Sequence, residues 1–414
     1  MKQAMIITVG TGSTVAHGIS RAIQDHHPEF VFFIGTEESI QKTLPAVLET
    51  SKLEENQYEI RTTQRPNDVE RISMECVEHI KCLMHRGYRP EEIVADFTSG
   101  TKAMSAGLVV ATFIMETGSV SYVHGERDQN GRVISGTERV TSIEPNRLLA
   151  EKKITLAIRL FNRYQFDSSL AVLSEVEGLI KTPDIVEKVT LLSRLTKAYS
   201  AWDRFELKAA IELLGGLENH PLASQWGIKK QLKHNNNTLH LEEKSQYSSF
   251  RAVDLLENAK RRAEEGKFDD AVARLYRLIE YLAQVKLHND YGRLLTDNLD
   301  ITALPNKLQG KYEQLKNSKQ KLELGLTRSY ELLEDLDDPL GKQFMEDYRR
   351  KGEIRVVLRM RNASILAHGF GPVGERAYCR CLRVIQDYLD LTFDNWRRIV
   401  PMVQFPKLRE NPLS

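Results

Sequence analysis

The sequence predicts a doubly wound α/β domain at the N-terminus, followed by an all-α connector and an all-α C-terminal domain. Short apolar runs alternate with amphipathic stretches over residues 1–147. Residues 148–245 and 246–414 show helical spacing alone. Strands that alternate with helices indicate a parallel sheet, because the crossover helices must cover both of its faces.

Four apolar runs in the first region have the length of buried strands: residues 4–9, 30–34, 58–62 and 92–96. Apolar side chains at helical spacing predict helices that end near residue 24 and span residues 68–86 and 102–115. Two later strands are expected at residues 120–123 and 132–134, with a turn around residues 129–131 between them.

Two segments of the helical part differ from their surroundings in polarity. Lys233 to Thr238 is a polar run that interrupts the apolar pattern, which predicts a linker between the two helical regions. Gly352 to Ala367 is rich in arginine and is expected to form one long basic helix.

Composition restricts the class of protein. Hydrophobic residues make up 41% and charged residues 28% of the 414 residues, which is typical of a soluble globular protein. The formal net charge of +1 predicts neither a nucleic-acid nor a membrane partner, so any basic surface must be local. The four cysteines form no CxxC pair, which argues against a disulfide scaffold or a zinc module. Apolar runs are too short for a signal peptide or a membrane span, so a cytoplasmic location is expected.

Three loops follow the first, second and fourth predicted strands and carry the chemistry of an anion site. Ligands of doubly wound sheets bind at this carboxyl edge, where neighbouring loops converge. Glycines let backbone N–H groups approach an anion, and Lys102 in the first turn of a helix opposes the helix dipole and therefore indicates an anionic ligand. The candidate ligand-binding residues are Gly10, Thr11, Gly12, Ser13, Thr36, Thr98, Ser99, Gly100, Thr101 and Lys102.

Known nucleotide motifs fit these loops poorly. No P-loop pattern is present, and the dinucleotide pattern G-x-G-x-x-G has Val15 at its third glycine position. Glu37 lies near the position of a ribose-binding acid, so a nucleotide-binding oxidoreductase stays open as a hypothesis. Gly10 and Gly12 are equally compatible with a simple turn and helix cap.

A second candidate site lies near the C-terminus, at Arg361, Asn362 and His368. Two turns of helix separate Arg361 from His368, which would place them on one face with Ser364 between them. RNA cleavage without a metal needs a proton-transfer group, which His supplies near neutral pH, and a cation for the phosphate oxygens, which Arg supplies. This reaction works better with two proton-transfer groups than with one. The single His of this segment therefore favours a symmetric dimer that brings two such histidines together.

The spacing of Arg361 and His368 also fits a surface arginine and a helix-end histidine. The local excess of positive charge favours a site for RNA. This excess comes from Arg349, Arg350, Lys351, Arg355, Arg359, Arg376, Arg380 and Arg383.

The two candidate sites together resemble one known family. Asp96 to Ser105 resembles the signature loop of CARF domains, the Rossmann-like sensors of CRISPR systems. Arg361-Asn362 followed by His368 resembles the Arg–His motif of HEPN ribonucleases, and residues 255–287 are similar to the first helices of that domain. The chain resembles the CRISPR-associated CARF–HEPN ribonucleases of type III systems, the Csm6/Csx1-like group.

This resemblance implies a CARF domain at residues 1–147, a helical connector at 148–245 and a HEPN domain at 246–414. The CARF loops would bind a cyclic oligoadenylate, expected to be cyclic tetra-adenylate, across a homodimer axis. Arg361, Asn362 and His368 would cut single-stranded RNA in antiviral defence at a composite dimer site that needs no metal. The spacing to His368 is at the long end for the motif. Some members also degrade their activator, and the corresponding positions here are Thr11, Ser13, Thr98 and Lys102.

The main hypothesis from sequence is therefore an allosteric endoribonuclease, in which ligand binding at the sheet biases a dimer between two states. A ligand-responsive RNA-binding or regulatory protein without catalytic turnover is the alternative from another class.

Overall fold

A computed structural model describes residues 2–410, apart from residues 13, 127–128, 130–132, 135, 180–181 and 317–320. Contacts divide the chain into two compact units, one of residues 1–154 with 173–189 and one of residues 155–172 with 190–414. Three helices, α6 (Pro145–Asn162), α7 (Phe166–Leu179) and α8 (Pro183–Asp203), have residues in both units.

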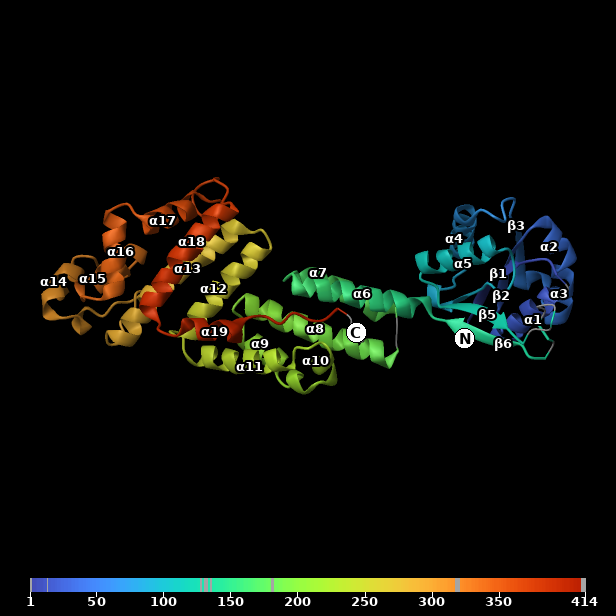
Figure 1. The fold of residues 1–414 in the computed structure, drawn as a ribbon, viewed down its shortest axis with the longest axis horizontal. Helices are drawn as coiled ribbons and strands as arrows, with labels where there is room; N and C mark the ends of the chain where they lie inside the picture. The colour runs from blue at the N-terminus through green and yellow to red at the C-terminus, as the bar shows by residue number, and fades with distance from the viewer. Residues whose placement is uncertain are drawn as a thin grey trace. The chain divides into compact units, whose positions relative to one another are not determined.

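The first unit is built around one sheet of six strands, ordered β3-β2-β1-β4-β5-β6 (Figure 1). The strands are β1 (Ala4–Val9), β2 (Phe30–Gly35), β3 (Tyr58–Thr62), β4 (Ile93–Asp96), β5 (Ser119–His124) and β6 (Arg139–Ile143). The first five pair in parallel, and β6 pairs antiparallel with β5. The doubly wound sheet predicted from the sequence is confirmed, with one antiparallel edge strand added.

Helices cover both faces of this sheet, as parallel crossovers require. Side chains of α1 (Val15–His26) and α3 (Leu44–Ser51) pack on one face, with α2 (Glu37–Lys42) preceding α3. Side chains of α4 (Val69–His85) and α5 (Lys102–Ile114) pack on the other face. Because β1 is fully buried, its alternate residues enter both cores.

The position predicted for the last strand is wrong. Val133 and Ile134 lie outside β6, which begins at Arg139, and most of the expected turn lies outside the described residues. The physical reason is exposure: four of the five β6 side chains are exposed, so this edge strand has no apolar run that marks it.

The second unit is helical throughout its described residues. Its core is arranged around α13 (Phe268–Asp290), which packs against α12 (Ser249–Glu264), α15 (Leu326–Asp335), α17 (Glu353–Ala363) and α18 (Glu375–Thr392). Its further helices are α9 (Leu207–Leu214), α10 (Pro221–Gln225), α11 (Lys229–Lys244), α14 (Asn306–Glu313), α16 (Pro339–Arg349) and α19 (Trp396–Val403).

The linker predicted at Lys233 to Thr238 is wrong, because these residues lie inside α11. Asn235 is fully buried there and bonds with the Tyr199 hydroxyl at 2.8 Å and with the carbonyl oxygen of Met402 at 2.7 Å. The polar side chain is therefore satisfied by a distant C-terminal segment. The polar residues of this segment predicted a loop, because the sequence does not show that Asn235 bonds with residues far along the chain.

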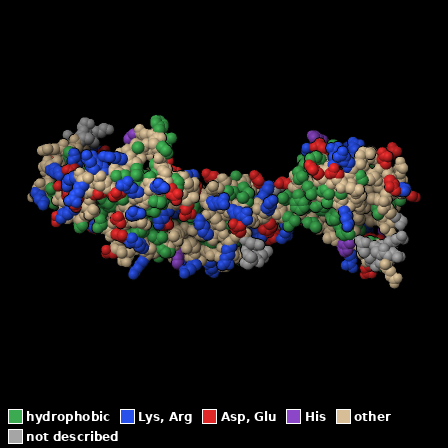
Figure 2. All heavy atoms as spheres, turned by 45° about the horizontal axis from the view of Figure 1, so that its top comes forward, with side chains coloured by type: hydrophobic (Ala, Val, Ile, Leu, Met, Phe, Trp, Pro, Cys, Tyr) green, Lys and Arg blue, Asp and Glu red, His purple; other side chains and the backbone are tan. Residues whose placement is uncertain are grey.

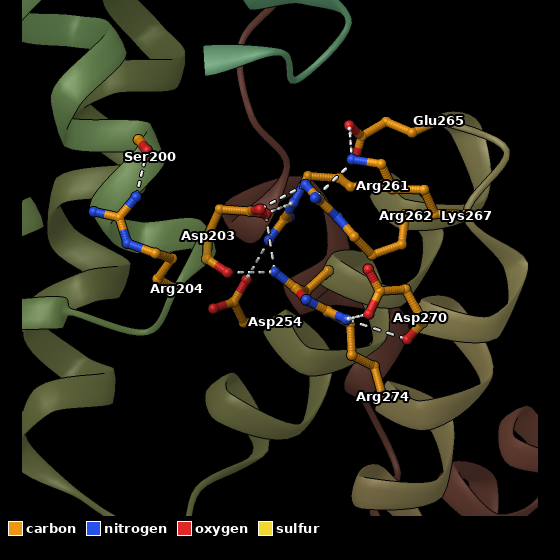
Figure 3. A network of polar contacts seen from close by, with 11 residues as sticks. Ser200, Asp203, Arg204, Asp254, Arg261, Arg262, Glu265, Lys267, Asp270 and Arg274 are labelled. Carbon is orange, nitrogen blue, oxygen red and sulfur yellow. Dashed lines mark hydrogen bonds and ion pairs between the residues drawn. The ribbon is translucent and has the colours of Figure 1, made fainter. Parts of the chain in front are cut away.

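A buried ionic network joins the end of α8 to α12 within the second unit (Figure 3). The Asp203 carboxylate accepts from Arg261 Nε at 2.8 Å and from Arg262 Nη2 at 2.6 Å. Trp202 Nε1 donates to Asp254 at 2.8 Å. The charged side chains of Asp203, Arg261 and Arg262 are almost fully buried, so the stability of each charge depends on its ion-pair partners.

All four cysteines are free thiols, and Cys76 and Cys381 are buried. Among the described residues, no helix is both long and apolar enough to cross a bilayer.

Candidate functional site

The helix that carries Arg361 and Asn362 ends earlier than the sequence predicts. α17 stops at Ala363, and Ser364 adopts an extended backbone as its C-cap. The Ser364 hydroxyl donates to the carbonyl oxygen of Arg361 at 2.8 Å, which satisfies an orphan group of the last turn. Arg361 and His368 therefore do not share one helix face, and the predicted helix to Ala367 is wrong.

A return turn nevertheless brings His368 back to the end of α17. The backbone N–H of His368 donates to the carbonyl oxygen of Asn362 at 3.2 Å, and that of Gly371 donates to Ala363 at 2.8 Å. At Gly369, a Cβ would lie 2.3 Å from the Ala363 carbonyl oxygen, so only glycine permits this close return. The turn thus places the backbone of His368 beside Asn362 without a continuous helix.

The Arg361 side chain lies between two groups that orient it. Its Nη1 donates to Asn362 Oδ1 at 3.2 Å, and its guanidinium lies 4.7 Å from the ring centroid of Tyr276 on α13. Glu280, one helical turn beyond Tyr276, bonds with the tyrosine hydroxyl. Burial raises the pKa of Glu280, whereas the nearby guanidiniums of Arg277 and Arg361 oppose this rise.

Tyr276 and Glu280 were not among the site residues predicted from the sequence. Tyr276 lies within the helices that resemble HEPN domains. Its contact with Arg361 depends on the packing of α13 against α17, two helices that are far apart in the sequence. His368 and Asn362 are exposed, as substrate-contacting groups must be.

The residues after Asn362 expose apolar side chains. Ile365 and Leu366 are 65% and 49% exposed. Phe370 is 91% exposed. A group of exposed apolar side chains beside a candidate site is typical of a protein–protein contact surface.

The basic residues around this site are partly neutralised. Arg349 pairs with Glu334, Arg350 with Glu346, and Arg380 with Glu353, at distances of 2.5 to 2.8 Å. The positive charge available to a ligand is therefore smaller than the sequence suggests. In Figure 2 the Lys and Arg side chains of the visible face are interspersed with Asp and Glu side chains.

In the first unit, the loops after β1 and β4 approach each other closely. A Cβ on Gly10 would lie 2.6 Å from the Gly100 backbone nitrogen, and Gly100 has a φ of +100° against the side chain of Thr8. The Ser99 hydroxyl donates to the carbonyl oxygen of Thr8 at 2.6 Å and accepts from Gly10 N at 3.1 Å. The two glycines are therefore required by loop packing.

Several hydroxyls expected to bind ligand are engaged within the protein. Thr101 caps α5 by accepting from Met104 N, and it donates to the carbonyl oxygen of Pro66. Thr98 accepts from Val123 N at 2.8 Å, and Thr36 caps α2. Their first role is to fix the loops. Thr36 keeps an O–H group that can donate to a ligand, whereas the single O–H of Thr101 already donates to Pro66.

Lys102, Thr11 and Gly12 remain as exposed candidates at this edge. Lys102 occupies the first residue of α5 and makes no ion pair with a described carboxylate. The positive charge of Lys102 is unfavourable beside the positive end of the α5 helix dipole. A bound anion would offset this repulsion, so the position suits an anion site. Ser13 lies outside the described residues.

Asp96 is a buried carboxyl group at the end of β4, directly before this loop. It is fully buried, and its Oδ1 accepts from Thr98 N at 3.0 Å. Burial raises its pKa to about 6, although hydrogen bonds from Thr98 act in the opposite direction. The carboxyl group fixes the start of the loop. No group of three or more His, Cys, Asp or Glu side chains in the described part of the chain could hold a metal ion.

Two family models match adjacent parts of the helical region. The "Csm6 6H domain" matches residues 149–246, and the "Csm6 HEPN domain" matches residues 242–392, which contain Arg361, Asn362 and His368. The chain is a Csm6-like CARF–HEPN protein. The family resemblance stated from the sequence is thereby confirmed.

Known proteins with this name are similar in sequence and in fold. The CRISPR system endoribonuclease Csm6 of Thermus thermophilus is 32% identical over 237 residues, which cover 53% of this chain and 48% of that protein. The match thus spans about half the length of the curated relative. The structure of Enterococcus italicus Csm6 bound to cyclic hexa-2′-fluoro-hexa-dAMP aligns with a TM-score of 0.56 at 15% identity, over 96% of this chain and 97% of that one. This likeness supports the α/β domain followed by helices.

Proposed function

We propose that this protein is an endoribonuclease that cuts single-stranded RNA at Arg361, Asn362 and His368 and is activated by a cyclic oligoadenylate. The observation that carries the proposal is the return turn after α17, which holds His368 beside Asn362 while Tyr276 and Asn362 hold Arg361. The Csm6 HEPN match to residues 242–392 supports it.

The chemistry suits an attack by the RNA itself. The 2′-oxygen would attack the adjacent phosphorus, and the bond from phosphorus to the 5′-oxygen would break. His368 would move the proton that leaves the 2′-hydroxyl or the one that the 5′-oxygen receives. The Arg361 guanidinium would stabilise the charge that develops on the phosphate oxygens, so this step needs no metal.

Two proton transfers and one His368 per chain favour a homodimer with a composite site. The exposed Ile365, Leu366 and Phe370 support a contact with a second copy next to the site. The domain assignment proposed for each copy is a CARF sensor at residues 1–147, a connector at 148–245 and a HEPN domain at 246–414.

The sensor proposal rests on the loops after β1 and β4. Their exposed Lys102, Thr11 and Gly12 would bind the phosphates of the activator. Binding can switch the enzyme only if the activator has different affinities for two states of the dimer. The Enterococcus italicus protein is bound to a cyclic analogue of six nucleotides, whereas a cyclic tetra-adenylate is expected here, so rings of both sizes belong in the test. Degradation of the activator at Thr11, Ser13, Thr98 and Lys102 stays a prediction.

The test is cleavage of a fluorogenic RNA in the presence of a chelator, with cyclic adenylates of four and six nucleotides added one at a time. The expected result is activation by one of the rings and loss of cleavage in His368→Ala. Equal activity of this variant and the wild type would overturn the assignment. RNA binding without cleavage under either activator would instead favour the non-catalytic RNA-binding alternative.

A further inference from the structure

A pocket of about 480 Å³ opens beside α17 and includes Asn362 in its wall. The other contributions come from α13, the first turn of α15, α16 and the preceding turns of α17. Its lining residues include Tyr276, Arg328, Tyr348, Arg355, Arg359 and Asn362. Since Asn362 belongs to the proposed cleavage site, the pocket is continuous with it.

The charge of this pocket has one sign. Among the residues that the structure describes, three arginines and no Asp or Glu line it. Arg328 pairs with Glu331 at 2.5 Å, whereas Arg355 and Arg359 make no ion pair with any carboxylate of the described residues. These two guanidiniums therefore stay available, unlike Arg349 and Arg350, whose pairs lie elsewhere. A concentrated, unpaired positive charge in a pocket attracts phosphate groups.

Tyrosine side chains complete the chemistry of the pocket. Tyr348 is half-buried, and the Arg355 guanidinium lies 5.1 Å from its ring centroid. Tyr276, on α13, also lines the pocket. Aromatic rings on which bases stack, beside cations that follow the backbone, are the two components of single-stranded nucleic-acid sites.

The arginines are arranged along one helix face that leads to the cleavage site. Arg355, Arg359 and Asn362 are spaced by four and three residues, which places them in one row on α17. This row extends over about 10 Å, at about 1.5 Å per residue. The first turn of α15 lines the same pocket, and its N-cap Gly325 offers no side-chain acceptor to the helix N–H groups.

We infer that this pocket binds a nucleotide of single-stranded RNA that flanks the scissile phosphate. Its base would stack on the Arg355 guanidinium, which lies over the Tyr348 ring, and its phosphate would contact Arg359. The inference rests on the proposed ribonuclease function and names the subsite that holds the substrate for it. The pocket contributes affinity and register, while Arg361 and His368 carry out the chemistry.

The direct test is RNA binding by the full-length His368→Ala protein, which does not consume its substrate. A fluorescein-labelled oligouridylate is titrated at several salt concentrations, with cyclic tetra- or hexa-adenylate present. Adding Arg359→Gln should weaken binding about tenfold and reduce the slope of log affinity against log salt by about 0.7. Adding Tyr348→Leu removes the ring under the Arg355 guanidinium, so it should weaken binding about tenfold and leave that slope unchanged.

Arg350→Gln is the matched control, because Arg350 is exposed on a neighbouring turn, pairs with Glu346 and does not line the pocket. It should bind as the parent protein does. Arg359 is exposed, so its replacement should not disturb folding. Wild-type affinity and salt slope in the Arg359→Gln protein would overturn the inference, whatever the result for Tyr348→Leu.

Cleavage kinetics distinguish this inference from the proposed function. In an otherwise wild-type protein, Arg359→Gln should raise KM about tenfold and leave kcat within about twofold. A fall in kcat at constant KM would place Arg359 in the chemistry and overturn its assignment to a binding subsite. Complete absence of cleavage by the wild type would contradict the ribonuclease proposal, while the binding titration would still decide whether RNA occupies the pocket.

Discussion

The guanidinium of Arg361 lies 4.7 Å from the ring centroid of Tyr276, so that a residue of α13 holds the arginine of the proposed site on α17. An arginine on an aromatic face keeps all its donors, because the ring contacts the guanidinium plane and not its edge. The donors that Asn362 does not use are then presented to a ligand in a fixed orientation. This contact makes Tyr276 a positioning residue.

Replacement of Tyr276 by leucine should therefore lower kcat for RNA cleavage about five- to thirty-fold, the range of a partly desolvated cation–π contact. Because Tyr276 also borders the flanking pocket, KM is measured in parallel and should change less than kcat. Tyr276→Phe is the control, since it keeps the ring and removes only the hydroxyl that bonds with Glu280. Equal losses in the phenylalanine and leucine variants would contradict the ring's role.

Asp203→Ala should destabilise the second unit by about 3 kcal/mol, because it leaves two enclosed guanidiniums short of a partner. Arg261 and Arg262 have side chains only 4% and 12% exposed, and both bond with this carboxylate (Figure 3). Urea unfolding measures the loss. Glu206→Ala, which breaks an exposed pair with Arg204, is the control and should leave the midpoint almost unchanged. A similar midpoint for both variants would contradict the structural role of the network.

The buried Asp96 predicts a pH dependence of stability in the sensor domain. Burial raises its pKa from 3.8 to about 6, so the folded state holds the proton more tightly than the unfolded state does. Stability from this group is complete below about pH 4 and is lost as the pH rises to 6. The full loss corresponds to about 3 kcal/mol.

Asp96→Asn isolates this contribution, because asparagine keeps an oxygen that can accept from Thr98 N and does not ionise. Urea unfolding of both proteins between pH 4 and 8 gives the difference in stability. The wild type should lose stability relative to the variant between pH 4 and 6 and stay parallel to it above pH 7. A constant difference over the whole range would mean that Asp96 does not titrate there.

The sequence predicted those elements whose apolar residues mark them. β1, β2 and α4 agree with their predicted ranges to within one or two residues, because buried strands and amphipathic helices carry strong periodic signals. β6 was misplaced because an exposed edge strand has no such signal. Lys233 to Thr238 was taken for a linker because the partners of Asn235 are far along the chain.

The candidate site shows the same limit. The sequence indicated Arg361, Asn362 and His368, yet the helix face that was expected to unite them does not exist. A capped helix end and the close return at Gly369 unite Asn362 and His368 instead. Tyr276 could not be identified, since its contact with Arg361 depends on the packing of two helices that are distant in sequence.

Sensing and cleavage should be separable by mutation, and one titration measures both. The rate of RNA cleavage is followed against activator concentration for the wild type, Lys102→Ala and His368→Ala. Lys42→Ala serves as the control, an exposed lysine of the same domain that pairs with Glu38. Thermal stability is recorded at each activator concentration.

Lys102→Ala should require more activator for half-maximal cleavage, by about tenfold or more, and reach the wild-type maximum. His368→Ala should show no cleavage and keep the wild-type thermal response to activator. Lys42→Ala should behave as the wild type does. Cleavage by His368→Ala at the wild-type rate, or a wild-type activator response in Lys102→Ala, would contradict the account.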